Sequence, residues 1–325
     1  MGRFLDKAVE HVKASYGEGS IFRFSDKPRN VEVISTGVLG IDLMTGVAGF
    51  PKGRIIELYG VNSSGKTTLA LQTVAQAQSI GLNAAYIDVE HALDPAYSEH
   101  LGIKMEDIFI SQPDSGEQAL ETAEMLLRSG ELNIVVVDSV DALVPQSVID
   151  GEMGAKHVAD LARLMSQAMR KLAAVVSKSN SVFIFINQIR QANFISGYGP
   201  QETTSGGVAL KFYAGMRIEM RPIGKLKDKN ECHIGNRTRL KVVKNKVAPP
   251  FKEHELDLIF GQGFVTENDL LEVAIANKIV EVRGAYYYYP QADLKLGQGK
   301  TAALSFLKDN PGLIDEIRMT ILSKE

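Results

Sequence analysis

The hydrophobic pattern of the chain alternates between two kinds of segment. Four runs of apolar residues, at 54–59, 83–91, 132–139 and 181–188, each end in polar residues, and the stretches between them are long enough for crossover helices. Continuous apolar strands that alternate with helices are typical of a parallel sheet with helices on both faces. We therefore predict an α/β fold in which the polar residues that close the strands lie together at one edge of the sheet, where ligands bind.

Helical patterns flank this core on both sides. Residues 3–16 predict a short amphipathic helix. The glycine-interrupted stretch after it separates it from the core, so its apolar face docks either on another molecule or on its own domain. Further helical patterns at 269–280 and from about residue 301 surround the tyrosine run 286–289, which favours a half-buried strand over a base-stacking platform. We expect three parts: an N-terminal helix and linker (1–30), a main domain (31–264) and a small C-terminal α+β domain (265–325).

A glycine-rich loop, GVNSSGKTT, joins the first strand to a helical pattern that runs to Ile80. Glycines permit the tight turn, backbone N–H groups can point at phosphate oxygens, and the helix presents its positive dipole end to the same anion. Lys66 adds a positive charge for the β- and γ-phosphates, and Thr67 offers a hydroxyl to Mg2+. The predicted nucleotide-phosphate site comprises Gly60, Ser63, Ser64, Gly65, Lys66, Thr67 and Thr68.

Three polar residues close the remaining strands. Asp138 is placed to act as the acidic partner of Mg2+, through water or through Thr67, or else is an exposed strand-end aspartate. Glu90 can orient or deprotonate the water that attacks a γ-phosphate, or can cap the helix that follows. Gln188 can sense the γ-phosphate by a side-chain hydrogen bond and pass this to the next loop, or can be a structural amide. The residues alone leave these alternatives open.

Charge and cysteine content narrow the function classes. A formal net charge of −3 over 325 residues excludes a generally basic DNA-coating protein, so any nucleic-acid surface has to be local. One basic row, Arg237, Arg239 and Lys241, lies on one face of a predicted strand. The single cysteine, Cys232, excludes an intramolecular disulfide and a cysteine-based metal site. No apolar segment has membrane-spanning length, and residues 1–13 lack a signal-peptide core, so we expect a cytoplasmic protein.

Two other segments are candidates for a nucleic-acid surface. In the helical pattern 156–178, Arg163, Ser166 and Arg170 share a face opposite the core stripe; this face either contacts a phosphate backbone or is only solvated. Residues 191–207 contain four glycines among apolar side chains, which suits a loop that orders on a ligand. The candidates for wedging between bases are Phe194, Ile195 and Tyr198.

Ten motifs spread over the chain resemble the bacterial RecA recombinase family. They are GVNSSGKTT, YIDVEHALDPAY, SQPDSGEQALE, VVVDSVDALVP, MSQAMRKLA, FINQIR, ETTSGG, ALKFYA, KVVKNK and LKDNP, and the resemblance covers residues 5–320. It implies a RecA-like P-loop ATPase core and a DNA-dependent ATPase. Such a protein polymerises on single-stranded DNA as a helical filament, binds ATP and Mg2+ between subunits, and exchanges strands with homologous double-stranded DNA in recombination, repair and the SOS response.

The resemblance also implies roles for single residues. For the nucleotide these are Glu90 as the catalytic carboxylate, Asp138 as the Mg2+-associated acid, Gln188 as the γ-phosphate sensor, Asp94 and Tyr97 on the adenine, and Lys244 and Lys246 on the ATP of the neighbouring subunit. For DNA they are Arg163, Ser166, Arg170, Arg190, Gly206 and Gly207, with Lys295 and Lys300 of the C-terminal domain gathering duplex. Phe212 and the N-terminal helix are implied at the subunit interface, and a LexA-like repressor as a partner.

The chain departs from the family pattern in its DNA loops. Ala159 and Asp160 stand where the family usually has a glycine and an apolar residue, and Asp160 adds a negative charge near DNA. The second loop is one residue longer, lacks the usual lysine, and has Val208 in place of an asparagine. The sequence ends without the acidic tail common in bacterial members. From this we expect weaker restraint on DNA binding and a divergent member, such as one carried by a plasmid or phage.

Two rival functions have to be weighed. A ring-shaped helicase motor on the same core would unwind a forked duplex directionally. A filament that serves mainly as a signalling platform would bind ATP and DNA to promote repressor self-cleavage. The N-terminal helix and the glycine-rich loop favour the recombinase filament, and Glu90, Lys244 and Lys246 argue against a loss of catalysis.

Overall fold

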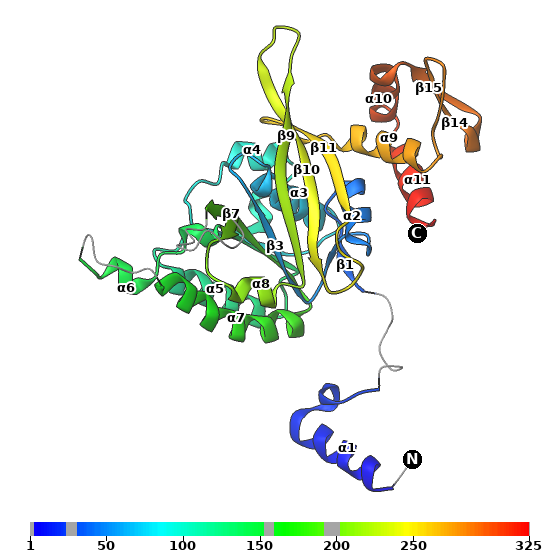
Figure 1. The fold of residues 1–325 in the computed structure, drawn as a ribbon. Coiled ribbons are helices and arrows are strands. Elements are labelled where there is room, and N and C mark those ends of the chain that lie inside the picture. Colours follow the sequence, from blue (N-terminus) through cyan, green and yellow to red (C-terminus); the bar gives the residue numbers. More distant parts are fainter. Residues whose placement is uncertain (1–2, 24–30, 153–158, 192–201, 325) are drawn as a thin grey trace. The chain divides into compact units, whose positions relative to one another are not determined.

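The computed structural model describes residues 3–23, 31–152, 159–191 and 202–324. These residues belong to two compact units, Met1–Glu32 and Val33–Glu325. Figure 1 shows the chain coloured from the N-terminus to the C-terminus. Among the described residues, no helix combines the length and the apolar character needed to cross a membrane.

The described residues of the first unit form one helix and a short turn. The helix α1 (Arg3–Tyr16) confirms the helix predicted at residues 3–16, and the 3-10 turn η1 (Glu18–Ser20) follows it. Its apolar side chains are not covered within the unit, since Phe4, Leu5 and Tyr16 are exposed. An exposed apolar face of this kind is typical of a segment that docks on another surface.

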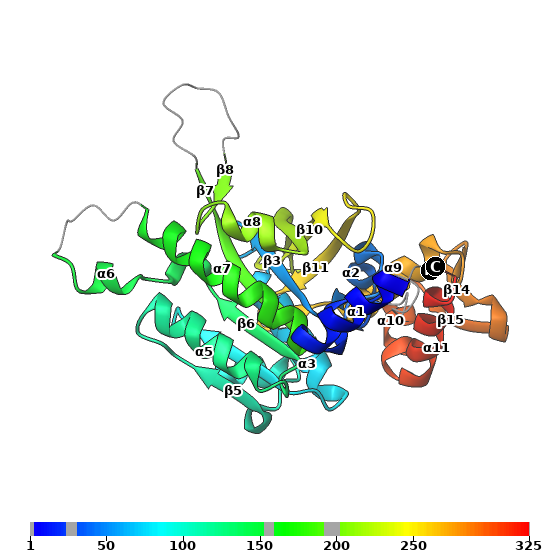
Figure 2. The ribbon, with the colours of Figure 1, turned by 90° about the horizontal axis from the view of Figure 1, so that it is seen from below.

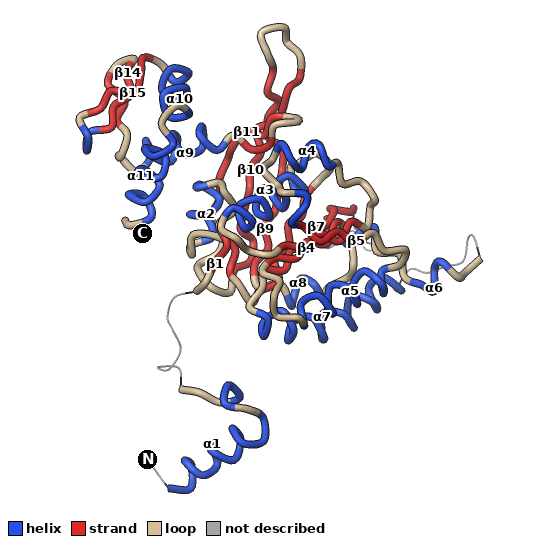
Figure 3. Tube along the Cα trace, turned by 180° about the vertical axis from the view of Figure 1, so that it is seen from behind, coloured by secondary structure: helices blue, strands red, loops and turns tan. Residues whose placement is uncertain are grey.

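A large sheet organises the second unit (Figures 1 and 3). Its strand order is β12-β11-β10-β9-β3-β7-β6-β4-β5, with β8 paired to β7 outside this path. The pairs from β9–β3 to β4–β5 are parallel, whereas β9 to β12 pair antiparallel. The strands are β3 (Arg54–Gly60), β4 (Ala84–Asp88), β5 (Ile108–Ser111), β6 (Ile134–Asp138), β7 (Val182–Gln191), β8 (Glu202–Thr204), β9 (Met216–Lys227), β10 (His233–Asn245), β11 (Glu253–Ile259) and β12 (Gly263–Phe264). A separate pair, β1 (Val33–Ile34) and β2 (Phe50–Pro51), is antiparallel.

The four predicted apolar runs are β3, β4, β6 and β7, and they lie in the parallel half as expected. Alternate side chains of these strands enter two cores: Val136 lies in the core with α3, while Val135 and Val137 lie in the core with α5 and α7. Figure 2 shows α5 and α7 on one face of the sheet. Because both faces are covered, these strands are mainly apolar, although Glu57 of β3 and Asn187 of β7 are buried polar exceptions. The helices and 3-10 turns are α2 (Leu39–Thr45), α3 (Lys66–Ser79), α4 (Pro95–His100), η3 (Met105–Asp107), α5 (Gly116–Arg128), η4 (Val140–Ala142), α6 (Gln146–Ile149), α7 (Asp160–Ser179) and α8 (Ala209–Tyr213).

The C-terminal residues form the expected small domain around a third core. Tyr289 is buried and Tyr286 to Tyr288 are half-buried, so the tyrosine run is the strand that the sequence favoured. Leu39 of α2 also belongs to this core, which ties the small domain to the rest of the unit. The elements are α9 (Thr266–Ala276), β13 (Glu281–Arg283), β14 (Tyr286–Tyr289), η5 (Pro290–Ala292), β15 (Leu294–Gln298), α10 (Lys300–Lys308) and α11 (Pro311–Leu322).

Three predicted helix bounds are wrong. Ile80 lies beyond the end of α3 and is exposed, because Gly81 with φ +78° turns the chain away from the core. The helix predicted at 269–280 is α9, which begins three residues earlier and ends at Ala276. The final helix predicted from about residue 301 is in fact two helices. Pro311 has no N–H to continue α10, so it begins α11 instead.

A close contact joins α2 to the C-terminal domain. The Gly40 backbone N–H donates to Asp269 Oδ2 at 2.8 Å, and Asp269 Oδ1 is hydrogen-bonded to His254 Nε2. A Cβ atom on Gly40 would lie 2.1 Å from His254 Nε2 and 2.6 Å from Asp269 Oδ1. Asp269 is almost fully buried, so this contact allows no side chain at position 40.

We expect Gly40→Ala to lower the free energy of unfolding by about 1–3 kcal/mol, because the new methyl group displaces the half-buried His254 and the buried Asp269 side chains. Chemical denaturation followed by circular dichroism measures the change. Gly312→Ala is the control, since a Cβ there meets no atom within 4 Å. Equal stability of Gly40→Ala and wild type would show that the junction can relax around the methyl group.

Candidate nucleotide site and DNA interface

The predicted phosphate loop lies at the carboxyl end of β3, between β7 and β9. Two of its glycines are required by their surroundings. A Cβ on Gly60 would lie 2.1 Å from the Met220 carbonyl oxygen, and one on Gly65 would lie 2.7 Å from Phe264 Cζ. Gly65 also has φ +88°, a conformation that favours glycine. The loop can therefore turn into the N-terminus of α3, which begins at Lys66.

A cavity of about 240 Å3 opens at this turn. The loop forms one side, and the end of β11 with the residue after it forms the other, through Leu258 and Phe260. Asn236 of β10 also supports the loop, because its Nδ2 donates to the Ser63 carbonyl oxygen at 3.3 Å. The antiparallel half of the sheet thus builds part of the candidate site. The loop residues that line the cavity are Ser63, Gly65, Lys66, Thr67 and Thr68.

The Lys66 side chain is held inside the loop. It is 8% exposed, and its Nζ donates to the carbonyl oxygens of Gly60 at 3.2 Å and Val61 at 2.8 Å. Burial lowers the pKa of Lys66, although the charges of Asp138 and Glu90 act in the opposite direction. A phosphate group would supply the anionic partner that these neutral carbonyls do not.

A hydroxyl and a carboxylate meet beside Lys66. Thr67 Oγ1 donates to Asp138 Oδ2 at 2.8 Å, and the Tyr86 hydroxyl donates to the same oxygen at 2.7 Å. Burial raises the pKa of Asp138, although the two hydrogen bonds oppose this. Burial and the neighbouring Asp138 also raise the pKa of Tyr86 well above its usual range. Among the described residues no three acidic, histidine or cysteine side chains cluster as metal ligands. A single carboxylate with a hydroxyl nevertheless fits Mg2+, which keeps waters and takes phosphate oxygens as further ligands.

Glu90 lies next to this pair. Its Oε1 accepts a hydrogen bond from Ser139 Oγ at 2.5 Å. The alternative that Glu90 caps the following helix is wrong, because Asp94 is the N-cap of α4 and accepts from the Tyr97 N–H at 3.2 Å. The Tyr97 hydroxyl lies 3.0 Å from Thr68 Oγ1, so α4 reaches the phosphate loop. Burial raises the pKa of Tyr97.

Gln188 is the β7 residue directly opposite Gly60 in the parallel register. It therefore lies one strand spacing, roughly 4.8 Å, from the start of the phosphate loop. The next residue but one, Arg190, pairs with Thr203 of β8. Gln188 thus lies between the nucleotide cavity and the strands that flank residues 192–201. Its γ-phosphate role and the structural-amide role both remain predictions.

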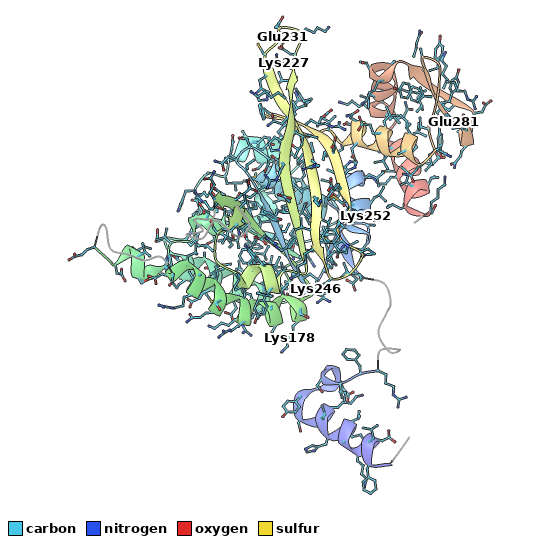
Figure 4. The ribbon with its side chains drawn as sticks, in the orientation of Figure 1. Lys178, Lys227, Glu231, Lys246, Lys252 and Glu281 are labelled. Carbon is cyan, nitrogen blue, oxygen red and sulfur yellow. The ribbon has the colours of Figure 1, made fainter. Side chains whose placement is uncertain are left out.

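Lys244 and Lys246 do not reach the phosphate loop of their own chain. In the sheet register, Lys244 pairs with Arg217 of β9, which pairs in turn with Glu57 of β3. The Lys246 N–H donates to the Gly215 carbonyl oxygen, and the Gly215 N–H donates to the Ile55 carbonyl oxygen. Ile55 is five residues before Gly60 along β3, a distance of roughly 16 Å. Figure 4 shows Lys246 at the opposite end of the sheet from the β9–β10 hairpin tip.

The exposed Phe212 of α8 marks this opposite end. Its carbonyl oxygen accepts from Lys244 Nζ at 2.8 Å and from Lys246 Nζ at 3.4 Å. Burial lowers the pKa of Lys244, and the nearby Lys246 and Arg217 lower it further. The two cations are thus held together at a surface, beside an exposed aromatic ring.

The DNA candidates on α7 lie as the sequence predicted. Arg163 and Arg170 are exposed and Ser166 is half-buried, opposite the buried core stripe of the same helix. Asp160 is the first residue of α7 and pairs with Arg163, with 3.8 Å between Oδ1 and Nη1. Ser147 Oγ donates to the other Asp160 oxygen at 3.0 Å. One of the two arginines on this face therefore has an acidic neighbour within its own chain.

The glycines at the end of the second DNA segment have a packing role. Gly206 and Gly207 have φ +81° and +77°, and Cβ atoms there would lie 2.8 Å from Val140 Cγ1 and 2.9 Å from Ala162 Cβ. They let the chain pass closely over η4 and α7. Val208 is exposed. The wedging candidates Phe194, Ile195 and Tyr198 lie outside the described residues.

The basic rows elsewhere are largely paired. Arg237, Arg239 and Lys241 share one face of β10, but β11 places acids opposite them, with Lys241 Nζ 2.6 Å from Glu253 and Arg237 Nη1 3.1 Å from Asp257. In the C-terminal domain Lys300 pairs with Glu272 at 2.7 Å, and Lys295 Nζ lies 3.7 Å from the centre of the Tyr286 ring.

Sequence reasoning missed several residues of the site. Tyr86 and Ser139, which hold Asp138 and Glu90, lie in or beside apolar runs, and nothing in the pattern sets Ser139 apart. Tyr86 carries one signal, since the hydroxyl of a tyrosine in a fully covered strand needs a buried partner. Leu258 and Phe260 come from the far half of the sheet and have no local motif.

The fold and this site define a P-loop ATPase of the RecA-like class. The model of the RecA N-terminal domain matches residues 3–265, and the model of the RecA C-terminal domain matches residues 268–324. The chain belongs to the RecA family, and is a DNA-dependent ATPase and recombinase of DNA recombination and repair.

Named relatives support the assignment over nearly the whole chain. Protein RecA of Caldanaerobacter subterraneus subsp. tengcongensis is 51% identical over 318 residues, which cover 98% of this chain and 92% of the relative. Protein RecA of Thermus thermophilus is 50% identical over 322 residues, which cover 98% and 94%. A crystal structure of the RadB recombinase shares the fold, with a TM-score of 0.52 and 21% identity over 71% of this chain and 98% of that one.

We expect Gly65→Ala to weaken nucleotide binding at least tenfold, because the new Cβ meets Phe264 and displaces the loop that lines the cavity. Titration with a fluorescent ATP analogue measures the affinity. Gly130→Ala is matched for backbone strain, since Gly130 has φ +76° but open space around it. Equal losses of nucleotide affinity in both variants would show that backbone strain alone causes the effect.

Proposed function

We propose that the recombinase binds ATP and Mg2+ in the phosphate-loop cavity, and that two neighbouring copies complete each site. One observation carries this proposal. The loop, Asp138 and Glu90 lie at the carboxyl end of the sheet, while the paired lysines of the same chain lie at the other end beside Phe212. A head-to-tail assembly brings the two ends together, and it builds a filament when the rotation between copies does not close into a ring.

At the carboxyl end each residue has a distinct task. Lys66 and the loop N–H groups bind the β- and γ-phosphates, and Asp94 and Tyr97 hold the adenine. Thr67 and Asp138 hold Mg2+, which neutralises charge on the phosphate oxygens. Glu90, fixed by Ser139, orients the attacking water and accepts its proton. Gln188 contacts the γ-phosphate and transmits its presence along β7.

The partner copy supplies the remaining groups. Lys244 and Lys246 contact the phosphates of the neighbour's ATP, so hydrolysis depends on assembly, as it does with an arginine finger. Phe212 lies at this interface. The N-terminal part, residues 1–30, docks its apolar helix face on a neighbouring copy, which is supported by the exposure of Phe4 and Tyr16.

DNA lies along the other surfaces in this proposal. Arg163, Ser166, Arg170 and Arg190 contact single-stranded DNA, and Gly206 and Gly207 shape the adjoining segment. Homologous duplex DNA is gathered by the C-terminal domain, residues 265–325, through Lys295 and Lys300. A cytoplasmic location and help in the self-cleavage of a LexA-like repressor complete the proposal, and both follow from family membership alone.

The first test is ATP hydrolysis with and without single-stranded DNA over a range of salt. We expect strong stimulation that fades as salt rises, because phosphate contacts release counterions. We expect Lys66→Ala to lower the DNA-stimulated rate of ATP hydrolysis at least 100-fold. Lys104→Ala, which replaces an exposed lysine, should keep the wild-type rate. DNA-independent rates would contradict the assignment. Directional unwinding of a forked duplex would favour the helicase.

Mixing two inactive variants tests the shared site. We expect Lys66→Ala and the double variant Lys244→Ala/Lys246→Ala each to be inactive alone. An equal mixture should recover about a quarter of the wild-type rate, because one interface in four joins an intact loop to intact lysines. Electron microscopy confirms that both variants assemble. If assembled mixtures stay inactive, the lysines do not act across the interface.

A further inference from the structure

Asp141 connects three separate parts of the chain. It lies in η4, and its carboxylate accepts two hydrogen bonds from Arg190, one of them from Nε to Oδ1 at 3.0 Å and the other from Nη2 to Oδ2. Ser205 Oγ also donates to Oδ1. Arg190 lies near the end of β7, and Ser205 follows β8. One carboxylate therefore joins the strands on either side of residues 192–201.

The two partners of this ion pair differ in freedom. The Asp141 side chain is 18% exposed and belongs to a short turn packed under Gly206, whereas the Arg190 side chain is 57% exposed. Burial raises the pKa of Asp141, but the hydrogen bonds from Arg190 and Ser205, with the charge of Arg190, outweigh it and hold this pKa below its usual range. Both groups are thus charged, and the arginine is the one that can leave.

The turn that carries Asp141 is continuous with the nucleotide site. Asp138, three residues earlier, accepts from Thr67, and Ser139 donates to Glu90. On the other side, the Ser205 carbonyl oxygen accepts from Asn187 Nδ2 at 3.1 Å, next to Gln188. The Arg190 guanidinium is therefore held by the segment that also positions the candidate catalytic and Mg2+ groups.

We propose that Asp141 is a positioning residue that keeps Arg190 bound within the protein until a phosphate of single-stranded DNA takes its place. The proposal rests on the proposed role of Arg190 in DNA binding. Both anions suit the planar guanidinium, which binds carboxylate and phosphate through two parallel hydrogen bonds. Each copy gives up an internal ion pair when it binds DNA. The contact of Arg190 with DNA therefore adds less to the affinity for single-stranded DNA than the contact of an unpaired arginine would. It also adds less to the salt dependence of that affinity.

The test uses the full-length chain, a fluorescent oligonucleotide of thymidines and a non-hydrolysable ATP analogue, with binding measured by anisotropy at several salt concentrations. We expect Asp141→Ala to bind about two- to fivefold more tightly at low salt, as loss of a partly exposed ion-pair partner implies. The slope of log affinity against log salt should steepen by up to roughly 0.7, the value for one further single-strand phosphate contact. The DNA affinity of Asp141→Asn should lie between those of Asp141→Ala and wild type.

Two controls separate this role from general charge or structure. In an Arg190→Ala background, Asp141→Ala should have no further effect. Asp150→Ala, which removes an exposed acid from the neighbouring α6 segment, should leave the slope unchanged. The inference would be overturned if Asp141→Ala also raised DNA affinity in the Arg190→Ala background, or if Asp150→Ala raised it equally. Weaker DNA binding by a folded Asp141→Asn would overturn it too. Absence of salt-dependent DNA binding in the wild type would instead refute the proposed function, and the inference with it.

Discussion

The absence of side chains at two positions of the phosphate loop is the constraint on which the structure depends. Gly60 passes beneath the Met220 carbonyl and Gly65 passes against Phe264, so the loop is pressed into the antiparallel half of the sheet. This packing fixes the turn that leads into the start of α3, the helix end that favours an anion. The nucleotide cavity is thus a product of tertiary packing as well as of the local motif.

The two charged side chains beside the phosphate loop are buried against neutral partners. Lys66 is buried against neutral carbonyls, whereas Asp138 is buried against two hydroxyls. Among the residues that the structure describes, neither group has an opposite charge in direct contact, which is costly in a buried site. A phosphate and a cation are the ligands that would relieve both. The unfavourable burial and the predicted chemistry therefore have the same physical origin.

Local patterns predicted the parallel strands, the phosphate loop and the small C-terminal domain, because each follows from residues close together in sequence. Contacts across the sheet could not be predicted from such local patterns. The acids that neutralise Arg237 and Lys241 depend on the β10–β11 register, and the pairing of Arg190 with Asp141 joins residues 49 positions apart. The end of α3 at Ser79 and the division of the last helix at Pro311 were missed because helical spacing continues past both.

The position of Lys244 and Lys246 at the end of the sheet away from the phosphate loop has a consequence for counting. If every site takes its loop from one copy and its lysines from the next, a row of n copies contains n − 1 complete sites. One terminal copy then holds a nucleotide that no neighbour can help to hydrolyse. At the other terminal copy, Lys244 and Lys246 contact no nucleotide of a neighbour. Turnover per chain would rise with the length of the row, and the two ends of the same filament would differ chemically.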